Sequence, residues 1–125
     1  MTHTALVVDD SMLIRHTVCR YLEEKGYNVE SATNGVEALE MLGNVHPDLI
    51  ITDVQMPKMD GRQLIDQLKS HGETAEIPVI ILANKQSSQQ SQVEHRANYV
   101  IYKDIDIREQ LERGLQLVLH SDVRG

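Results

Sequence analysis

The chain has 125 residues, close to the commonest size of a single domain, and its hydrophobic (41%) and charged (25%) fractions are ordinary for a folded protein. The formal charge of -7 argues against direct nucleic-acid binding, because contacts to phosphate depend on clustered Lys and Arg. The single cysteine, Cys19, excludes an internal disulfide, and the sequence has neither a signal segment nor an apolar stretch of membrane-spanning length. We therefore expect one domain over residues 1–125, in the cytoplasm, without membrane contact.

Short runs rich in Val and Ile, bounded by turn or cap residues, predict buried β-strands. They span residues 4–8, 27–31, 48–52, 77–83 and 99–102. Three of these runs are apolar on both faces, which is typical of parallel strands that are covered by helices on either side. The second run, YNVES, is the least apolar of the set.

Segments of helical spacing separate the strands. The predicted helices span residues 12–25, 36–42, 61–71 and 105–120, and each carries an apolar stripe. Gly26 is a stop signal for the first helix, and Asp60 is a candidate cap for the third. The Gln/Ser-rich segment 85–98 has few apolar anchors, so we expect a helix there that is short, frayed or displaced. The alternation of strands and helices predicts a doubly wound α/β fold.

Three carboxylates follow the predicted strands. Asp9 and Asp10 come directly after the first strand, and Asp53 follows the third. In an open α/β sheet, ligands bind beyond the carboxyl ends of the strands, where the strand order reverses. Carboxylates gathered there repel one another unless a cation intervenes, and Mg²⁺ prefers such oxygen ligands. With Lys103 after the fifth strand, the pattern indicates a site that handles phosphoryl groups.

Simpler roles remain open for the same residues. Asp10 or Ser11 can cap the first helix, and Asp53 can be a turn-forming residue. Lys103 can be an ordinary solvent-exposed lysine, and Cys19 is expected to pack in the protein rather than react.

Four stretches together resemble the receiver domain of two-component response regulators, in particular the chemotaxis regulators, over essentially the whole chain. They are VVDD, DLIITDVQMPKMDG, IPVIIL and YVIYK. The resemblance implies a flavodoxin-like fold. In that fold, a five-stranded parallel sheet of order 2-1-3-4-5 has helices on both faces.

The same resemblance implies roles for individual residues. Asp53 matches the phosphoacceptor, whose donor is a phosphohistidine of a sensor histidine kinase or a histidine phosphotransfer protein. Asp10 matches a direct Mg²⁺ ligand and Asp9 a ligand through water, while Asp53 and the backbone carbonyl of Gln55 complete the metal site. Lys103 matches the lysine that pairs with a phosphoryl oxygen. Such a protein catalyses only its own phosphorylation and dephosphorylation.

Two switch positions depart from the family pattern. Ala83 stands where the family usually has Thr or Ser, and Val100 stands where it tends to have Tyr or Phe. In addition, Asp104 replaces the usual Pro after the lysine. These departures predict an atypical coupling between phosphorylation and conformation.

Two kinds of function therefore stay open. One is a signalling domain controlled by phosphorylation, which relays its signal by protein–protein contact. The other is a receiver-like interaction module that binds partners whether or not it is phosphorylated. In either case we expect the downstream partner to bind the face formed by segment 85–98, strand 99–102 and helix 105–120.

Overall fold

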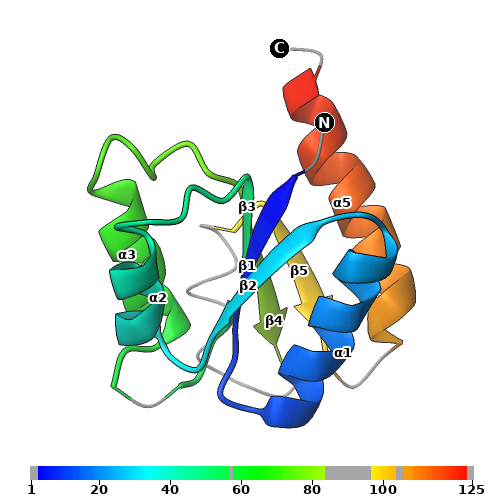
Figure 1. The fold of residues 1–125 in the computed structure, drawn as a ribbon, viewed down its shortest axis with the longest axis horizontal. Coiled ribbons are helices and arrows are strands. Elements are labelled where there is room, and N and C mark those ends of the chain that lie inside the picture. Colours follow the sequence, from blue (N-terminus) through cyan, green and yellow to red (C-terminus); the bar gives the residue numbers. More distant parts are fainter. Residues whose placement is uncertain (1–2, 57, 84–96, 104–105, 124–125) are drawn as a thin grey trace.

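A computed structural model describes residues 3–56, 58–83, 97–103 and 106–123. Five strands form one parallel sheet of order β2-β1-β3-β4-β5 (Figure 1). The strands are β1 (Thr4–Val8), β2 (Asn28–Ala32), β3 (Leu49–Asp53), β4 (Val79–Ala83) and β5 (Tyr99–Tyr102). The predicted strand order is confirmed, and each predicted strand agrees with the structure to within two residues.

Helices cover both faces of this sheet. Figure 1 shows α1 (Met12–Glu24) and α5 (Ile107–Val123) on one side, and α2 (Gly35–Met41) and α3 (Gly61–Lys69) on the other. The helix expected within segment 85–98 falls almost wholly outside the described residues. None of the described helices is long and apolar enough to cross a membrane.

The core consists of two apolar layers, one on each face of the sheet. Alternate residues of the strands supply them: Val7 and Ile51 pack towards α1 and α5, whereas Leu6 and Ile50 pack towards α2 and α3. All four side chains are fully buried, as expected for strands covered on both faces. Cys19 is partly buried against the first layer, in agreement with its predicted packing role.

Helix caps fix the connections that follow β1 and β3. Ser11 is the N-cap of α1, and its hydroxyl accepts a hydrogen bond from Ile14 N at 3.3 Å. Of the two candidate caps in the sequence, Ser11 therefore takes this role and leaves the carboxylate of Asp10 to other partners. Asp60 caps α3 in a reciprocal capping box with Gln63, as its position in the sequence predicts.

Helices α1 and α2 agree with the prediction to within one residue at each end, whereas α3 and α5 differ by two or three residues, and α5 begins at Ile107 rather than at residue 105. Helix α3 ends at Lys69 rather than at residue 71, because Ser70 forms the C-cap and its hydroxyl donates to the carbonyl oxygen of Gln67 at 2.8 Å. Helix α5 continues to Val123, beyond the last apolar residue of its stripe.

The outer strands differ from the three central strands. In β2, which forms one edge of the sheet, Asn28, Glu30 and Ser31 are exposed. An edge strand has a neighbour on one side only, so it needs fewer apolar residues than a central strand. This position explains the weak apolar character of the second run.

Candidate functional site

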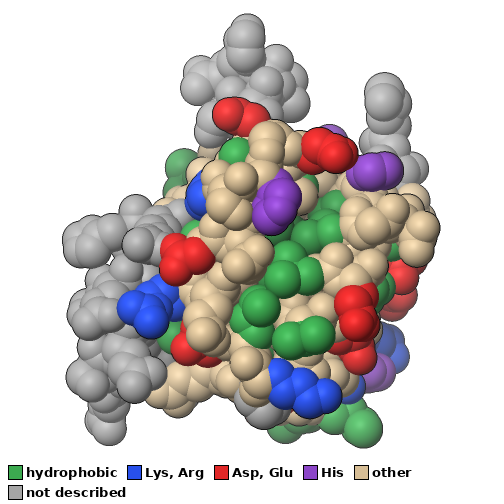
Figure 2. All heavy atoms as spheres, turned by 90° about the vertical axis from the view of Figure 1, so that its left-hand side faces the viewer, with side chains coloured by type: hydrophobic (Ala, Val, Ile, Leu, Met, Phe, Trp, Pro, Cys, Tyr) green, Lys and Arg blue, Asp and Glu red, His purple; other side chains and the backbone are tan. Residues whose placement is uncertain are grey.

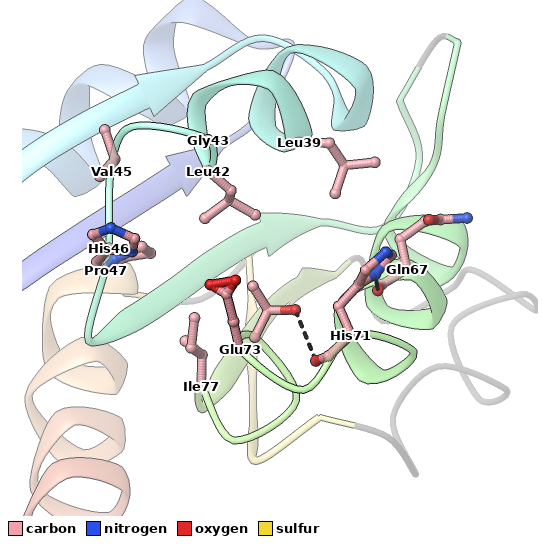
Figure 3. A pocket seen from close by; sticks show the side chains of 11 residues that line it. Leu39, Leu42, Gly43, Val45, His46, Pro47, Gln67, His71, Glu73 and Ile77 are labelled. Atoms are coloured by element: carbon pink, nitrogen blue, oxygen red, sulfur yellow. Dashed lines mark hydrogen bonds between the residues drawn. The ribbon is translucent and has the colours of Figure 1, made fainter.

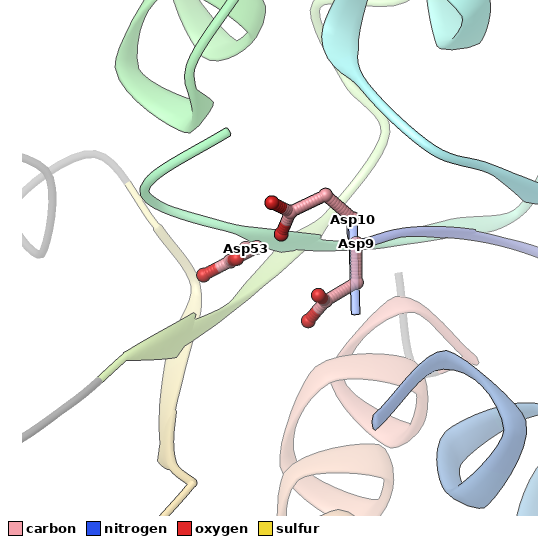
Figure 4. A group of neighbouring side chains, drawn as sticks. All are labelled: Asp9, Asp10 and Asp53. Atoms are coloured by element: carbon pink, nitrogen blue, oxygen red, sulfur yellow. The ribbon is translucent and has the colours of Figure 1, made fainter. Parts of the chain in front are cut away.

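Three carboxylates meet at the carboxyl edge of the sheet. Asp9 and Asp10 follow β1, and Asp53 is the last residue of β3. The two strands pair in parallel with Val8 opposite Thr52, so the residues that follow lie side by side. One carboxylate oxygen from each aspartate lies within 4.8 Å of the others (Figure 4).

Burial makes the charged forms of these carboxylates unfavourable. Asp9 is fully buried and Asp53 is 6% exposed, whereas Asp10 is exposed. Burial, together with the nearby charge of Asp9, raises the pKa of Asp53 from 3.8 to about 6. Burial likewise raises the pKa of Asp9. The charged carboxylates therefore need a cation beside them.

Lys103 supplies one positive charge. Its Nζ lies 3.0 Å from Asp53 Oδ1 and 3.2 Å from Asp9 Oδ2, and its side chain is only 14% exposed. Burial alone would lower the pKa of Lys103, but the hydrogen bond and charge of Asp53, reinforced by Asp9, raise it above its ordinary value. The side chain is therefore an ammonium ion at neutral pH. Lys103 lies beside the aspartates as predicted, and the alternative of an ordinary solvent-exposed lysine is excluded.

Backbone and side-chain donors hold the aspartates in place. Ser11 N donates to Asp9 Oδ1 at 2.8 Å, and Val54 N donates to Asp53 Oδ1 at 2.8 Å. From α1, the guanidinium of Arg15 donates to the carbonyl oxygen of Asp9 at 2.7 Å. Arg15 is not among the site residues predicted from the sequence, because its contact depends on the rotamer and on how α1 lies against the sheet.

The donor set fits a hard divalent cation. Asp9 Oδ2 is buried, and among the described residues it has the Lys103 ammonium as an ion-pair partner but no well-aligned hydrogen bond. Among the described residues, the three carboxylates of the cluster outnumber the two cations beside them, the Lys103 ammonium and the Arg15 guanidinium, so negative charge remains in excess. Oxygen ligands with excess negative charge are what Mg²⁺ and Ca²⁺ bind in proteins.

The connection between β3 and α3 passes close to the cluster. Gln55 lies in it, two residues after Asp53, and is exposed. Gly61 N donates to the carbonyl oxygen of Val54 at 2.7 Å, so this hydrogen bond joins the start of α3 to the residue that follows β3. A Cβ atom at Gly61 would overlap the carbonyl oxygen of Asp53 and lie 3.0 Å from Val54 Cα. Glycine is therefore required sterically at this position.

The two switch positions lie on β4 and β5. Ala83 ends β4 and is 2% exposed, and its carbonyl oxygen accepts from Lys103 N at 2.8 Å. A methyl side chain has no hydrogen-bond donor to offer. Val100 is partly buried and packs against the apolar layer that faces α2 and α3. Asp104, the third departure from the family pattern, lies outside the described residues.

A separate cavity of about 400 Å³ lies beside α2 and α3, away from the acid cluster. Figure 2, which looks onto this side of the molecule, shows hydrophobic side chains gathered there. Thr74 lines the cavity together with the residues that Figure 3 labels, which are Leu39, Leu42, Gly43, Val45, His46, Pro47, Gln67, His71, Glu73 and Ile77. None of the three aspartates lines this cavity, so it is not part of the candidate site.

Comparison with curated proteins gives relatives among response regulators. The response regulator MprA of Mycobacterium sp. (strain KMS) is 42% identical over 82 residues, which are 66% of this chain and 35% of that protein. MprA of Mycobacterium ulcerans is 41% identical over 87 residues, which are 70% of this chain and 37% of the relative. The matched part of the chain thus spans little more than a third of these relatives.

Solved structures resemble the whole fold. The signal receiver domain of a signal transduction histidine kinase from Syntrophus aciditrophicus superposes with a TM-score of 0.85 at 33% identity, covering 95% of this chain and 92% of that one. The chemotaxis response regulator CheY4 of Vibrio cholerae gives a TM-score of 0.84 at 28% identity, covering 94% and 100%. The family model of the response regulator receiver domain matches residues 5–114. With this match and the acid cluster at the carboxyl edge of its sheet, the chain belongs to the response regulator receiver domains of two-component systems.

Proposed function

We propose that Asp53 accepts a phosphoryl group from a phosphohistidine in a reaction that requires Mg²⁺, and that residues 1–125 form a single receiver domain. The observation that supports this function is the contact of one ammonium, Lys103, with both buried carboxylates of the cluster, Asp9 and Asp53. Such a cluster offers a nucleophilic oxygen and a positive charge for the oxygens of an incoming phosphoryl group.

The chemistry needs few parts. A carboxylate oxygen of Asp53 attacks phosphorus, the new O–P bond forms as the P–N bond to the donor imidazole breaks, and the imidazole takes up a proton from solvent. The ammonium of Lys103 faces the transferred oxygens and stabilises their charge. Asp9, Asp10, Asp53 and the backbone carbonyl of Gln55 would hold Mg²⁺, which when bound neutralises charge on the phosphoryl oxygens.

Receiver domains interact with histidine kinases and with downstream effectors. For this chain we propose a sensor histidine kinase or a histidine phosphotransfer protein as the donor, and a cytoplasmic location. The downstream partner would bind the face formed by segment 85–98, strand 99–102 and helix 105–120, most of whose first segment lies outside the described residues. In this proposal the protein binds no nucleic acid and catalyses only its own phosphorylation and dephosphorylation.

Incubation with acetyl phosphate and Mg²⁺ tests this function directly. We expect intact-mass spectrometry to show one added phosphoryl group, because the buried carboxylate of Asp53 is the nucleophile. Omitting Mg²⁺ with EDTA present, or substituting Asp53→Asn, should abolish the gain. A folded wild-type protein that gains no phosphoryl group, even when rapid sampling excludes fast hydrolysis, would contradict the proposal.

Ala83 favours a second candidate, a module whose partner binding depends little on phosphorylation. In the family a hydroxyl at this position donates to the phosphoryl group, and a hydrogen bond to a charged group contributes about 1.5–3 kcal/mol. The methyl group of Ala83 cannot make this bond. The coupling between phosphorylation and conformation should therefore be weaker by about one to two orders of magnitude in the equilibrium constant.

Backbone amide shifts measure this coupling. With a beryllium fluoride adduct on Asp53 as the phosphoryl mimic, we expect shift changes close to the acid cluster that do not extend through residues 97–102. The Ala83→Thr variant restores a hydroxyl, so its changes should reach β5. Large changes throughout β5 in the wild-type protein would show that the switch works without the hydroxyl.

A further inference from the structure

Gln110 on α5 holds the backbone of the residue that precedes Lys103. Its Oε1 accepts a hydrogen bond from Tyr102 N at 2.9 Å, and its Nε2 donates to the carbonyl oxygen of Tyr102 at 2.8 Å. Nε2 also donates to the carbonyl oxygen of Asp106 at 3.2 Å. A single amide thus pairs both polar backbone groups of Tyr102, as a neighbouring strand would.

The other side of β5 is held by the sheet. Ala83 lies opposite Tyr102 in the register of β4 and β5, and Lys103 N donates to the carbonyl oxygen of Ala83 at 2.8 Å. The end of β5 is therefore held from two sides, by the backbone of β4 and by the side chain of Gln110. Both contacts lie at or next to the residue whose ammonium reaches the acid cluster.

The position of this backbone decides where the ammonium lies. Lysine has a flexible four-carbon stem, so its side chain does not fix its own direction. The ammonium lies 3.0 Å from Asp53 Oδ1 and 3.2 Å from Asp9 Oδ2 with the Cα of Lys103 in its present place, so a displaced Cα would force the side chain into another conformation to keep both contacts. A displacement of about 1 Å in a reacting group can slow a reaction about 100-fold.

We propose that Gln110 is a positioning residue for Lys103: its amide fixes the end of β5 and thereby places the ammonium between Asp9 and Asp53. The two hydrogen bonds between Gln110 and the backbone of Tyr102 are called the clamp below. The effect of Gln110 on phosphoryl transfer rests on the proposed function, whereas the clamp does not. Glutamine suits this role because its side-chain amide has both an acceptor and a donor. The acceptor is needed for the N–H group of Tyr102, and the donor for its carbonyl oxygen.

Three variants separate this role from general packing. Gln110→Met keeps the length of the side chain and removes all its hydrogen bonds, whereas Gln110→Glu keeps the acceptor for Tyr102 N and loses the donors. Gln116→Met is the matched control, an exposed glutamine on the same helix. We expect faster hydrogen exchange of the Tyr102 amide in Gln110→Met and exchange near the wild-type rate in Gln116→Met. Gln110→Glu should give an intermediate rate, because its second oxygen would face the carbonyl oxygen of Tyr102, to which Nε2 donates in the wild type.

The phosphorylation rate with acetyl phosphate and saturating Mg²⁺ is the second measurement. We expect Gln110→Met to lower it about tenfold, within the range for a misplaced group, and Gln116→Met to leave it unchanged. Because Gln110 acts through Lys103, adding Gln110→Met to Lys103→Met should produce no further decrease. If Gln110 had a merely structural role, the decreases in phosphorylation rate from Gln110→Met and Lys103→Met would add in the double variant.

The outcomes separate the inference from the proposed function. An unchanged Tyr102 exchange rate in Gln110→Met overturns the clamp. A normal phosphorylation rate in Gln110→Met, or additive losses in the double variant, overturns the positioning role. If the wild-type protein accepts no phosphoryl group, the proposed function fails, and the positioning role in transfer fails with it. Tyr102 exchange still decides whether the clamp exists.

Discussion

Substitution of Lys103 by Met is expected to lower the free energy of unfolding by about 3 kcal/mol at pH 8 without divalent ions. The variant leaves the two carboxylates that Lys103 contacts, Asp9 and Asp53, buried without their ammonium partner. Removing one member of a buried ion pair costs this much because the remaining charge is neither solvated nor paired. Urea unfolding in the presence of EDTA measures the loss.

The loss should depend on pH in a defined direction. The pKa of Asp53 is about 6 in the folded protein and 3.8 in the reference state, so the folded protein binds this proton more tightly than the unfolded chain does. Stability from this group is therefore greatest at low pH and falls as the pH rises from about 4 to about 6. Without Lys103 the carboxyl pKa values rise further, so the variant loses stability over a higher pH range.

The difference in unfolding free energy between wild type and Lys103→Met should consequently be small near pH 5 and reach its full value of about 3 kcal/mol at pH 8. Lys25→Met is the matched control, because Lys25 is exposed and has no ion pair among the described residues. We expect its effect to stay below about 1 kcal/mol and to vary little over this range. An equal loss at pH 5 and pH 8 for Lys103→Met would contradict the electrostatic explanation.

Substitution of Gly61 by Ala has the second large expected effect. The added Cβ would overlap the carbonyl oxygen of Asp53 and lie 3.0 Å from Val54 Cα, and backbone atoms cannot give way as a flexible side chain can. Overpacking of this kind costs about 3 kcal/mol in unfolding free energy. The strain acts on the backbone of Asp53, so at the proposed metal site we also expect weaker Mg²⁺ binding than in the wild type, measured by titration calorimetry at a temperature where the variant is folded.

Gly72→Ala is the control for this experiment. A Cβ at Gly72 meets no atom within 4 Å, and the backbone there does not have a positive φ angle. The control should therefore be within about 0.5 kcal/mol of wild type. If Gly61→Ala is as stable as Gly72→Ala, the connection between β3 and α3 can move away from the strand more easily than its geometry indicates.

The arrangement of the acid cluster followed from the sequence because it depends on topology rather than on side-chain detail. Asp9, Asp10 and Asp53 each follow an apolar run, and the ends of neighbouring parallel strands meet at one edge of the sheet. Lys103 was placed by the same reasoning, as the residue after the last run. The ends of the predicted strands placed these residues at one edge of the sheet, and the resemblance to receiver domains supplied the strand order that makes β1 and β3 neighbours.

Other contacts could not be predicted in this way. Arg15 and Gln110 bond to backbone atoms of other elements, so their partners depend on rotamers and on how each helix lies against the sheet. Neither interaction leaves a periodic trace in the sequence. The close approach of Gly61 to Asp53 likewise depends on the path of the connecting residues, which the motif alone does not specify.

The two edges of the sheet affect how this domain can meet other proteins. Unpaired backbone groups at an edge allow a foreign chain to add a strand, which leads to β-augmentation or to sheet polymers. Here Glu30 places an exposed charge in the middle of the short strand β2, and the amide of Gln110 already pairs with Tyr102 on β5. We therefore expect partners to recognise side chains of this domain rather than to add a strand to its sheet, and concentrated solutions to resist edge-to-edge polymerisation.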